Sequence, residues 1–169
     1  MADSLSNIRV GFYTSSGSWP NHQRWHYDTA RELFNRGYSV QMITPSRGRL
    51  SARTMRQGIE VKRFSKKGLF IIDMTRLARI LKHAGITTLL INYPNDLRLA
   101  AAAARLAGVR RVIFRQGTIS YIRPNLLNQF VLHYFVDTVV TNSQANRRKM
   151  LREKGKLFSP ESTRVIYNG

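Results

Sequence analysis

Short runs of β-branched and aromatic residues alternate with amphipathic stretches along the whole chain. The first run, Ile8 to Thr14, ends in a turn rich in serine and glycine and predicts a strand. From His22 onward the apolar positions Tyr27, Ala30 and Leu33 recur every three or four residues, as on one face of a helix, until a glycine ends the stretch. A strand followed by a helix is the first half of a βαβ unit.

The same alternation repeats to the end of the chain. Further strands are predicted at Tyr38 to Thr44, Ile59 to Phe64, Ile86 to Asn92, Arg111 to Arg115, Thr138 to Asn142 and Thr163 to Tyr167. Further helices are predicted at Phe70 to Ala84, from an Asp96 N-cap to Ala107, from Pro124 as first helical residue to about Phe135, and from a Ser143 N-cap to about Lys154. Flexible segments are expected at Met1 to Ser6, Ser46 to Gln57 and Gly155 to Ser162.

Short strands between longer helices predict an α/β fold, in which a parallel sheet is covered on both sides. We therefore expect a doubly wound, mostly parallel Rossmann-like sheet with helices on both faces. The length of 169 residues and the 43% hydrophobic content suit a single domain over residues 1–169.

Composition narrows the classes of protein. The chain has no cysteine, which excludes disulfides and thiolate ligands, and its four histidines lack metal-ligand spacing, so no metal site is expected. No apolar run approaches the ~18 residues of a membrane-spanning helix, and no leader is recognisable. The expected location is the cytoplasm, with peripheral contact at the inner membrane face.

The charge is unusual, because 28 Lys and Arg oppose 9 Asp and Glu, for a net charge of +19. Such an excess predicts an anionic partner. Between residues 47 and 67 one acid, Glu60, accompanies a set of cations that we expect to form an anion- or membrane-binding surface: Arg47, Arg49, Arg53, Arg56, Lys62, Arg63, Lys66 and Lys67. A nucleic-acid partner and a merely solvated surface are the alternatives, although the aromatic residues fall mostly in predicted strands and helices instead of between the cations.

Candidate ligand-binding residues follow the strands, since an open parallel sheet binds ligands beyond the carboxyl ends of its strands. They are hydroxyls, amides, aromatics and two arginines, which suit sugar hydroxyls and phosphate. The set comprises Gly17, Trp19, Asn21, Gln23 and Arg24, then Asn92, Tyr93 and Asn95, then Arg115, Gln116, Gly117 and Thr118, then Asn142 and Ser143.

Several catalytic motifs are missing from the sequence. It contains no dinucleotide-binding G-x-G-x-x-G after the first strand, no P-loop and no G-x-S-x-G elbow. No two carboxylates are arranged for glycoside hydrolysis. The nearest acids, Asp96 and Asp137, are better explained as a helix cap and as a cap or turn residue before the sixth strand.

Four strings resemble glycosyltransferase family 4, whose members have the GT-B fold. The pattern from Ala30 to Thr44 is similar to the family's A-x-x-L-x-x-R-G-H-x-V. The other three strings lie at strand ends: Val112 to Gly117, Val139 to Ser143, and Val165 to Gly169. The string from Val165 to Gly169 is similar to the family's V-I-P-N-G. The last string marks the junction between the two domains of such enzymes. The resemblance covers nearly the whole chain.

The resemblance implies that the chain is the N-terminal, acceptor-side half of a nucleotide-sugar-dependent glycosyltransferase. This half is expected to bind no cofactor and to be inactive alone. The donor-binding domain, with an E-x7-E motif, is expected outside this chain. The whole enzyme is expected to transfer a sugar, with retention, to a lipid-linked or cell-surface polysaccharide acceptor. The residues expected near the donor phosphate or reacting sugar are Gly17, Asn21 and Arg24, and those expected to line the cleft are Tyr93, Gln116, Gly117 and Ser143.

Two departures from the family pattern affect this site. Pro20-Asn21 stands where the family has a Gly-Gly turn, and proline offers no amide to a phosphate. Gln116 stands where the family has a histidine, so the side chain hydrogen-bonds but does not titrate near neutrality. A nucleic-acid-binding or non-catalytic scaffold domain is the alternative function.

Overall fold

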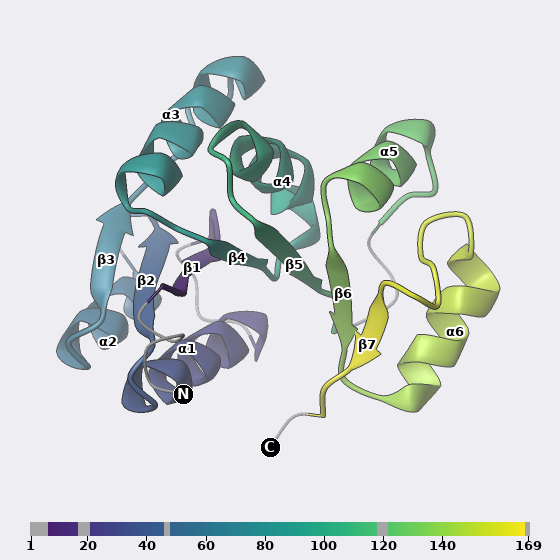
Figure 1. Cartoon of the computed structure of the whole chain (residues 1–169), viewed down its shortest axis with the longest axis horizontal. Coiled ribbons are helices and arrows are strands. Elements are labelled where there is room, and N and C mark those ends of the chain that lie inside the picture. The colour runs from purple at the N-terminus through teal and green to yellow at the C-terminus, as the bar shows by residue number, and fades with distance from the viewer. Residues whose placement is uncertain (1–6, 17–20, 46–47, 118–121, 168–169) are drawn as a thin grey trace.

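The protein forms a seven-stranded, all-parallel sheet with helices on both faces, as seen in a computed structural model (Figure 1). The structure describes residues 7–16, 21–45, 48–117 and 122–167, and for Asn21 and His22 the backbone alone. The strand order is β3-β2-β1-β4-β5-β6-β7. The predicted doubly wound α/β fold is confirmed.

The elements follow the predicted alternation closely. The strands are β1 (Arg9–Tyr13), β2 (Ser39–Thr44), β3 (Glu60–Arg63), β4 (Thr88–Ile91), β5 (Arg111–Arg115), β6 (Thr138–Thr141) and β7 (Thr163–Val165). The helices are α1 (Asn21–Asn35), α2 (Arg49–Arg56), α3 (Phe70–His83), the short 3-10 helix η2 (Pro94–Asp96), α4 (Leu97–Leu106), α5 (Leu126–Tyr134) and α6 (Gln144–Lys154).

The strand order reverses direction between β1 and β4. From β1 the chain winds outward to β3, returns to β4 beside β1, and then winds outward again to β7. In Figure 1, α3, α4 and α5 cover one face of the sheet, α1 and α2 cover the other, and α6 packs against β6 and β7. Such a reversal opens a crevice at the carboxyl ends of the two strands where it occurs.

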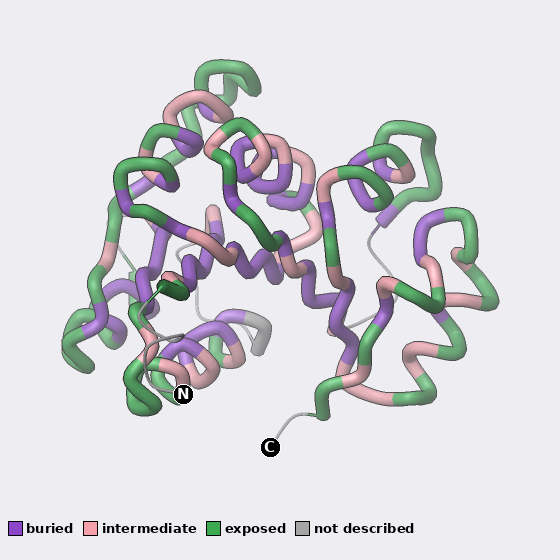
Figure 2. The backbone as a smooth tube through the Cα atoms, in the orientation of Figure 1, coloured by how far each residue is buried: buried purple, intermediate pink, exposed green. Residues whose placement is uncertain are grey.

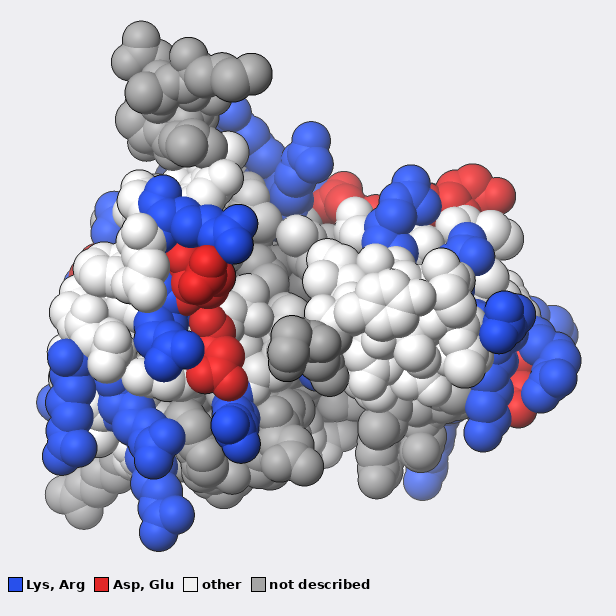
Figure 3. All heavy atoms as spheres, turned by 90° about the horizontal axis from the view of Figure 1, so that it is seen from below, with Lys and Arg blue, Asp and Glu red and all other residues white. Residues whose placement is uncertain are grey.

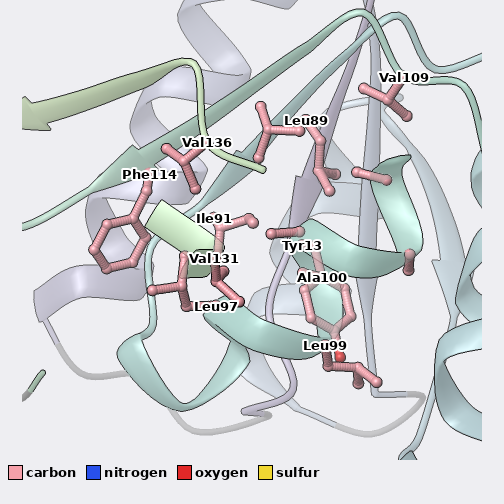
Figure 4. Close-up of a cluster of buried hydrophobic side chains, with 14 of the residues drawn as sticks. Tyr13, Leu89, Ile91, Leu97, Leu99, Ala100, Val109, Phe114, Val131 and Val136 are labelled. Atoms are coloured by element: carbon pink, nitrogen blue, oxygen red, sulfur yellow. The ribbon is translucent and has the colours of Figure 1, made fainter. Parts of the chain in front are cut away.

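The core consists of two apolar clusters, one on each face. Successive side chains of a strand point to opposite faces, so Phe12 and Tyr13 belong to different clusters. Tyr13 joins Ile91 and Phe114 in the larger cluster under α3, α4 and α5 (Figure 4). Phe12 joins Met42 in the cluster under α1 and α2. The middle of the sheet is buried on both sides, as the tube in Figure 2 shows.

The segment Ser46 to Gln57 was expected to be flexible, and this prediction is wrong for most of it. The structure places α2 there, with Leu50, Ser51 and Thr54 buried against the sheet. Two of these three buried residues carry hydroxyls, and the Thr54 Oγ1 donates to the Leu50 carbonyl at 2.8 Å. A buried face with so few apolar residues leaves no periodic signal in the sequence.

Pro124 was expected as the first residue of a helix, and this is also wrong. Helix α5 begins at Leu126, and its N-cap is Asn125, whose side chain accepts a hydrogen bond from the Asn128 amide at 2.8 Å. Asparagine is among the preferred N-cap residues, and its cap fixes the helix start two residues later.

Candidate functional site

The candidate site is the carboxyl rim of the sheet where β1, β4, β5 and β6 end. The N-termini of α1, α4 and α6 meet the same rim, because each helix follows one of these strands. Helix N-termini and the loops before them supply amide donors for anionic and hydroxyl-bearing ligands. The rim next to the β1–β4 reversal is therefore the place where a ligand is expected.

Arg115, the last residue of β5, lies at the centre of this rim. Its side chain is buried, and its Nη1 donates to the Asn92 Oδ1 at 3.2 Å. The guanidinium carbon stands 4.4 Å from the centre of the Trp25 ring, so the cation stacks on an indole of α1. Burial lowers the pKa of Arg115 to about 10, which leaves the group charged at neutral pH. The rim thus holds a fixed positive charge.

Gly117 makes room for this charge. A Cβ at position 117 would stand 2.9 Å from the Nη1 of Arg115, too close for the guanidinium to keep its place. The adjacent Gln116 is buried, and its amide donates to the Val140 carbonyl at 2.7 Å, which prolongs the pairing of β5 with β6. A side chain at position 117 would therefore displace the end of Arg115 from its present position.

The start of α6 is tied to the same turn. The Ser143 Oγ accepts from the Asn146 amide at 3.1 Å, which confirms the predicted N-cap. The Asn146 Nδ2 donates to the Asn142 Oδ1 at 2.5 Å and to the Gly117 carbonyl at 3.4 Å. These bonds join the ends of β5 and β6 into one polar network.

Asp96 was expected to cap α4, and this prediction is wrong. The residue occupies the N-cap position with helical backbone angles, φ −94° and ψ −18°, and its side chain caps no amide. A capping residue has extended angles that aim its oxygen at the first turn. The buried Asp96 carboxylate instead accepts from the Ser15 amide at 2.7 Å and from the Lys66 Nζ at 2.7 Å. Asp96 thus joins the loops that follow β1, β3 and β4.

Tyr13 lies beneath this ion pair. Its hydroxyl is buried, and burial together with the nearby charge of Asp96 raises the pKa of the Tyr13 phenol above its ordinary value. The phenol therefore stays neutral at physiological pH.

Asp137 lies away from the candidate site. Its carboxylate accepts from the Val112 amide at 2.7 Å and from the Arg105 Nη2 at 2.9 Å, at the amino ends of β5 and β6. It occupies the turn before β6, in agreement with the sequence interpretation of Asp137 as a cap or turn residue before that strand.

The structure brings four of the seven predicted cleft residues to the rim: Tyr93, Gln116, Gly117 and Ser143. Tyr93 directly follows Asn92, and its hydroxyl accepts from the Asn95 Nδ2 at 3.3 Å. The other three surround the end of β5 and the start of α6.

The remaining three predicted cleft residues belong to the β1–α1 connection. Arg24 lies near the start of α1, largely exposed, and pairs with Asp28 at 3.7 Å. Asn21 begins α1, and its side chain lies outside the described residues, as does Gly17.

Trp25 is the residue that sequence reasoning missed. The rim residues predicted after the first strand ended with Arg24, one residue before Trp25. Its contact with Arg115 crosses from α1 to β5. Asn92 and Arg115 belonged to the wider rim set but not to the seven cleft residues.

The predicted anion surface is divided between α2, β3 and the loop after β3. Arg49, Arg53 and Arg56 form one exposed stripe of α2, at steps of four and three residues. Arg63 and Lys67 are exposed too, whereas Arg47 lies outside the described residues. Two further cations are engaged in ion pairs, Lys62 with Glu60 at 3.1 Å and Lys66 with Asp96. Figure 3 shows Lys and Arg gathered at both ends of one face of the molecule.

A cavity of about 510 Å³ lies elsewhere, near the amino ends of β1, β2 and β3. It is lined by Arg9, Gln41, Glu60, Lys62, Arg79, Ile80, His83 and Ala84. Its position at the opposite edge of the sheet separates it from the rim described above. Within the described ranges, no group of three or more acidic or histidine side chains is placed to hold a metal ion. None of the described helices has the length and apolar character needed to cross a bilayer.

Solved structures share this fold. The chain aligns over 96% of its length with Anabaena HepE in complex with UDP and glucose, at 18% identity and a TM-score of 0.74, and covers 45% of that chain. It aligns over 96% with a glycosyltransferase from Rickettsia africae, at 15% identity and a TM-score of 0.77, and covers 44% of it. The lipopolysaccharide outer core galactosyltransferase WaaB aligns over 95%, at 11% identity and a TM-score of 0.68, with 46% of its chain covered.

The chain thus spans less than half the length of these proteins. No curated protein sequence matches it. A sequence profile described as Glycosyltransferase Family 4 matches residues 23–169, which include β2 to β7 and every rim residue from Gln23 onward. A match over most of the chain, together with a GT-B-like half and its polar carboxyl rim, establishes that this protein belongs to glycosyltransferase family 4.

Proposed function

We propose that this chain is the acceptor-side domain of a nucleotide-sugar-dependent glycosyltransferase, and that a donor-binding domain outside the chain completes the cleft. The observation that carries the proposal is the charged Arg115 at the carboxyl rim, bonded to the Asn92 side chain and stacked on the Trp25 ring. Family membership supports the reaction class. UDP and glucose in the HepE complex support a nucleotide-sugar as donor. On its own the domain would be inactive, because it lacks the donor site.

In the proposed reaction, an acceptor hydroxyl oxygen bonds to the anomeric carbon of the sugar while the bond to the nucleoside diphosphate breaks. The hydroxyl proton leaves with the diphosphate, so that attack and departure share one face and configuration is retained. The departing diphosphate gains negative charge, and a preorganised cation beside it stabilises the transition state. We assign this role to Arg115, because its guanidinium lies at the rim, bonded to Asn92 and stacked on the Trp25 ring.

The other rim residues would position substrates. Gln116 and Tyr93 offer amide and hydroxyl groups to sugar hydroxyls, and Arg24 adds a second cation near the start of α1. Gly17 and Asn21 remain proposed members of the site on the strength of the family resemblance. The proposed acceptor is lipid-linked or a cell-surface polysaccharide, the class to which the lipopolysaccharide named for WaaB belongs.

The test compares two arginine variants of the intact enzyme, either as one polypeptide or with its donor half supplied. Arg115→Met removes the buried rim charge, whereas Arg105→Met removes a half-buried arginine that pairs with Asp137 at the opposite edge. Loss of one stabilising donor is expected to lower kcat about a hundredfold for Arg115→Met. Arg105→Met should leave kcat within about twofold. Equal turnover by the two variants would overturn the role given to Arg115.

We also propose that the exposed cations of α2, β3 and the following loop bind anionic lipid at the inner membrane face. Each Lys or Arg that reaches the headgroups contributes roughly 1 kcal/mol, and the attraction is screened by salt. The expected result is sedimentation with anionic vesicles but not with zwitterionic ones, weakened by salt. Salt-dependent binding to DNA or RNA fragments without vesicle binding would favour the nucleic-acid alternative.

A further inference from the structure

Four consecutive apolar residues at the start of α3 face solvent. We call Leu69, Phe70, Ile71 and Ile72 the α3 apolar patch; their exposed fractions lie between 44% and 70%. Because α3 follows β3, the patch lies at the same edge of the sheet as the candidate site, and exposed turns of α3 are visible in Figure 2. Contiguous apolar surface of this kind on a folded domain marks a contact with another molecule or a membrane.

The backbone around the patch is held in place before any partner binds. The buried Asp73 carboxylate accepts from the Lys67 amide at 2.9 Å, from the Gly68 amide at 3.0 Å and from the Arg76 Nη1 at 3.1 Å. Gly68 has φ +87°, a left-handed conformation that favours glycine. These contacts clamp the preceding loop onto the first turn of α3. The patch is therefore ordered, and little backbone entropy is lost when it docks.

The patch also breaks a local rule of helix formation. Leu69 occupies the N-cap position of α3 with extended angles, φ −103° and ψ 105°, and its side chain caps no amide. Serine, threonine, aspartate or asparagine would stabilise the helix better at this position. Departures from local preference concentrate at functional positions, where the side chain has another role.

Charge indicates which kind of partner the patch meets. Residues 63–76 contain four cations and one carboxylate, and Arg63 and Lys67 are exposed. By contrast α5 exposes a comparable apolar stripe, Leu126, Leu127, Phe130 and Tyr134, but residues 122–137 contain one arginine and one aspartate. Exposed apolar side chains that directly follow a basic loop fit a bilayer with anionic headgroups, since the apolar groups enter the acyl boundary while Lys and Arg stay among the headgroups.

We propose that the α3 apolar patch inserts into the interface of an anionic lipid bilayer and turns the carboxyl rim toward that bilayer. A lipid-linked acceptor would then reach the rim from the membrane, and this one consequence rests on the proposed function. It adds an apolar anchor to the salt-sensitive attraction of the basic surface. Insertion depends on Phe70 and Ile71, and charge alone does not replace them.

The test measures binding of the full chain to vesicles of phosphatidylglycerol and phosphatidylcholine, with pure phosphatidylcholine vesicles as reference. The variant Phe70→Ser/Ile71→Ser is compared with the matched control Leu126→Ser/Leu127→Ser on α5. Both pairs are exposed, so neither change is expected to unfold the domain. The patch variant should bind anionic vesicles about tenfold or more weakly, because each buried methylene adds to membrane affinity. The control should bind like the unmodified protein.

Insertion itself is followed with Phe70→Trp and Leu127→Trp, using lipids that carry a quencher at the acyl boundary. Phe70→Trp fluorescence should be quenched, whereas Leu127→Trp fluorescence should not. Equal vesicle binding by both serine variants, or an unquenched Phe70→Trp, would refute insertion. Dimers that dissociate in Phe70→Ser/Ile71→Ser would also refute it, since a second copy would then cover the patch. The assay contains no sugar donor, so its failure leaves the transferase proposal untouched, and failed sugar transfer leaves insertion untouched.

Discussion

Replacing Asp96 by serine separates two roles for that residue. Serine is as good an N-cap as aspartate, so a capping role would survive Asp96→Ser. In the structure, however, the carboxylate accepts from the Ser15 amide and from the Lys66 Nζ, both at 2.7 Å. The shorter, neutral serine side chain cannot replace both contacts.

The expected loss follows from these two contacts. Hydrogen bonds to charged groups contribute about 1.5–3 kcal/mol each to stability. The Lys66 side chain is 31% exposed, so water recovers part of its contribution once the carboxylate is gone. We expect Asp96→Ser to lower the free energy of unfolding by about 2–4 kcal/mol. If Asp96 acted only as a helix cap, the same change would lower it by a few tenths of a kcal/mol.

Urea unfolding followed by circular dichroism measures this difference, with two variants for calibration. Ser143→Ala removes an N-cap that the structure does contain and should cost about 1 kcal/mol. Glu32→Gln removes an exposed ion pair with Arg36 and should cost at most about 0.5 kcal/mol. If Asp96→Ser unfolds within about 0.5 kcal/mol of the unmodified protein, the carboxylate does not join the loops as described.

Three further outcomes are expected. Gly117→Ala should change the free energy of unfolding by less than about 1 kcal/mol, because the far end of the flexible Arg115 side chain gives way. It should nevertheless shift the fluorescence emission of Trp25, measured in a variant with Trp25 as its single tryptophan, because the cation leaves the indole. An unshifted emission would contradict this. Gly68→Ala should cost about 1–2 kcal/mol of unfolding free energy in a thermal melt, since φ +87° strains any residue with a Cβ; a neutral result would argue against the left-handed turn. Burial raises the pKa of Glu60, but the hydrogen bonds of Lys62 and Gln41 and the charges of Lys62 and Arg9 together outweigh it, so the pKa lies below its ordinary value. The stabilisation is therefore present above the pKa of the unfolded state and is lost as the pH falls through the pKa of the folded state. Glu60→Gln should therefore cost at most about 1 kcal/mol at pH 7 and nothing well below pH 4, and a loss that persists in acid would refute the sign.

The sequence by itself determined the elements and the face that each side chain takes. Because successive side chains of a strand point to opposite faces, Phe12 and Tyr13 had to lie on different sides of β1, and the recurrence of Tyr27, Ala30 and Leu33 every three or four residues marked the buried stripe of α1. The cap at Ser143 was readable because its partner, the Asn146 amide, is three residues away. Where a local signal was weak, as in the short and polar α2, the prediction failed. Membership of the carboxyl rim followed as well, since it depends only on which residues come after a strand.

Only the tertiary structure decided what the rim residues touch. Asp96 binds an amide 81 positions earlier and a lysine 30 positions earlier, and Arg115 stacks on a tryptophan of the first helix. These contacts exist because β1 and β4 became neighbours while the chain wound outward in both directions, an order that no local periodicity encodes. Caps and periodic faces depend on residues within about one helical turn, whereas a site between strands depends on which strands pair, and that choice is made by the burial of the whole sheet.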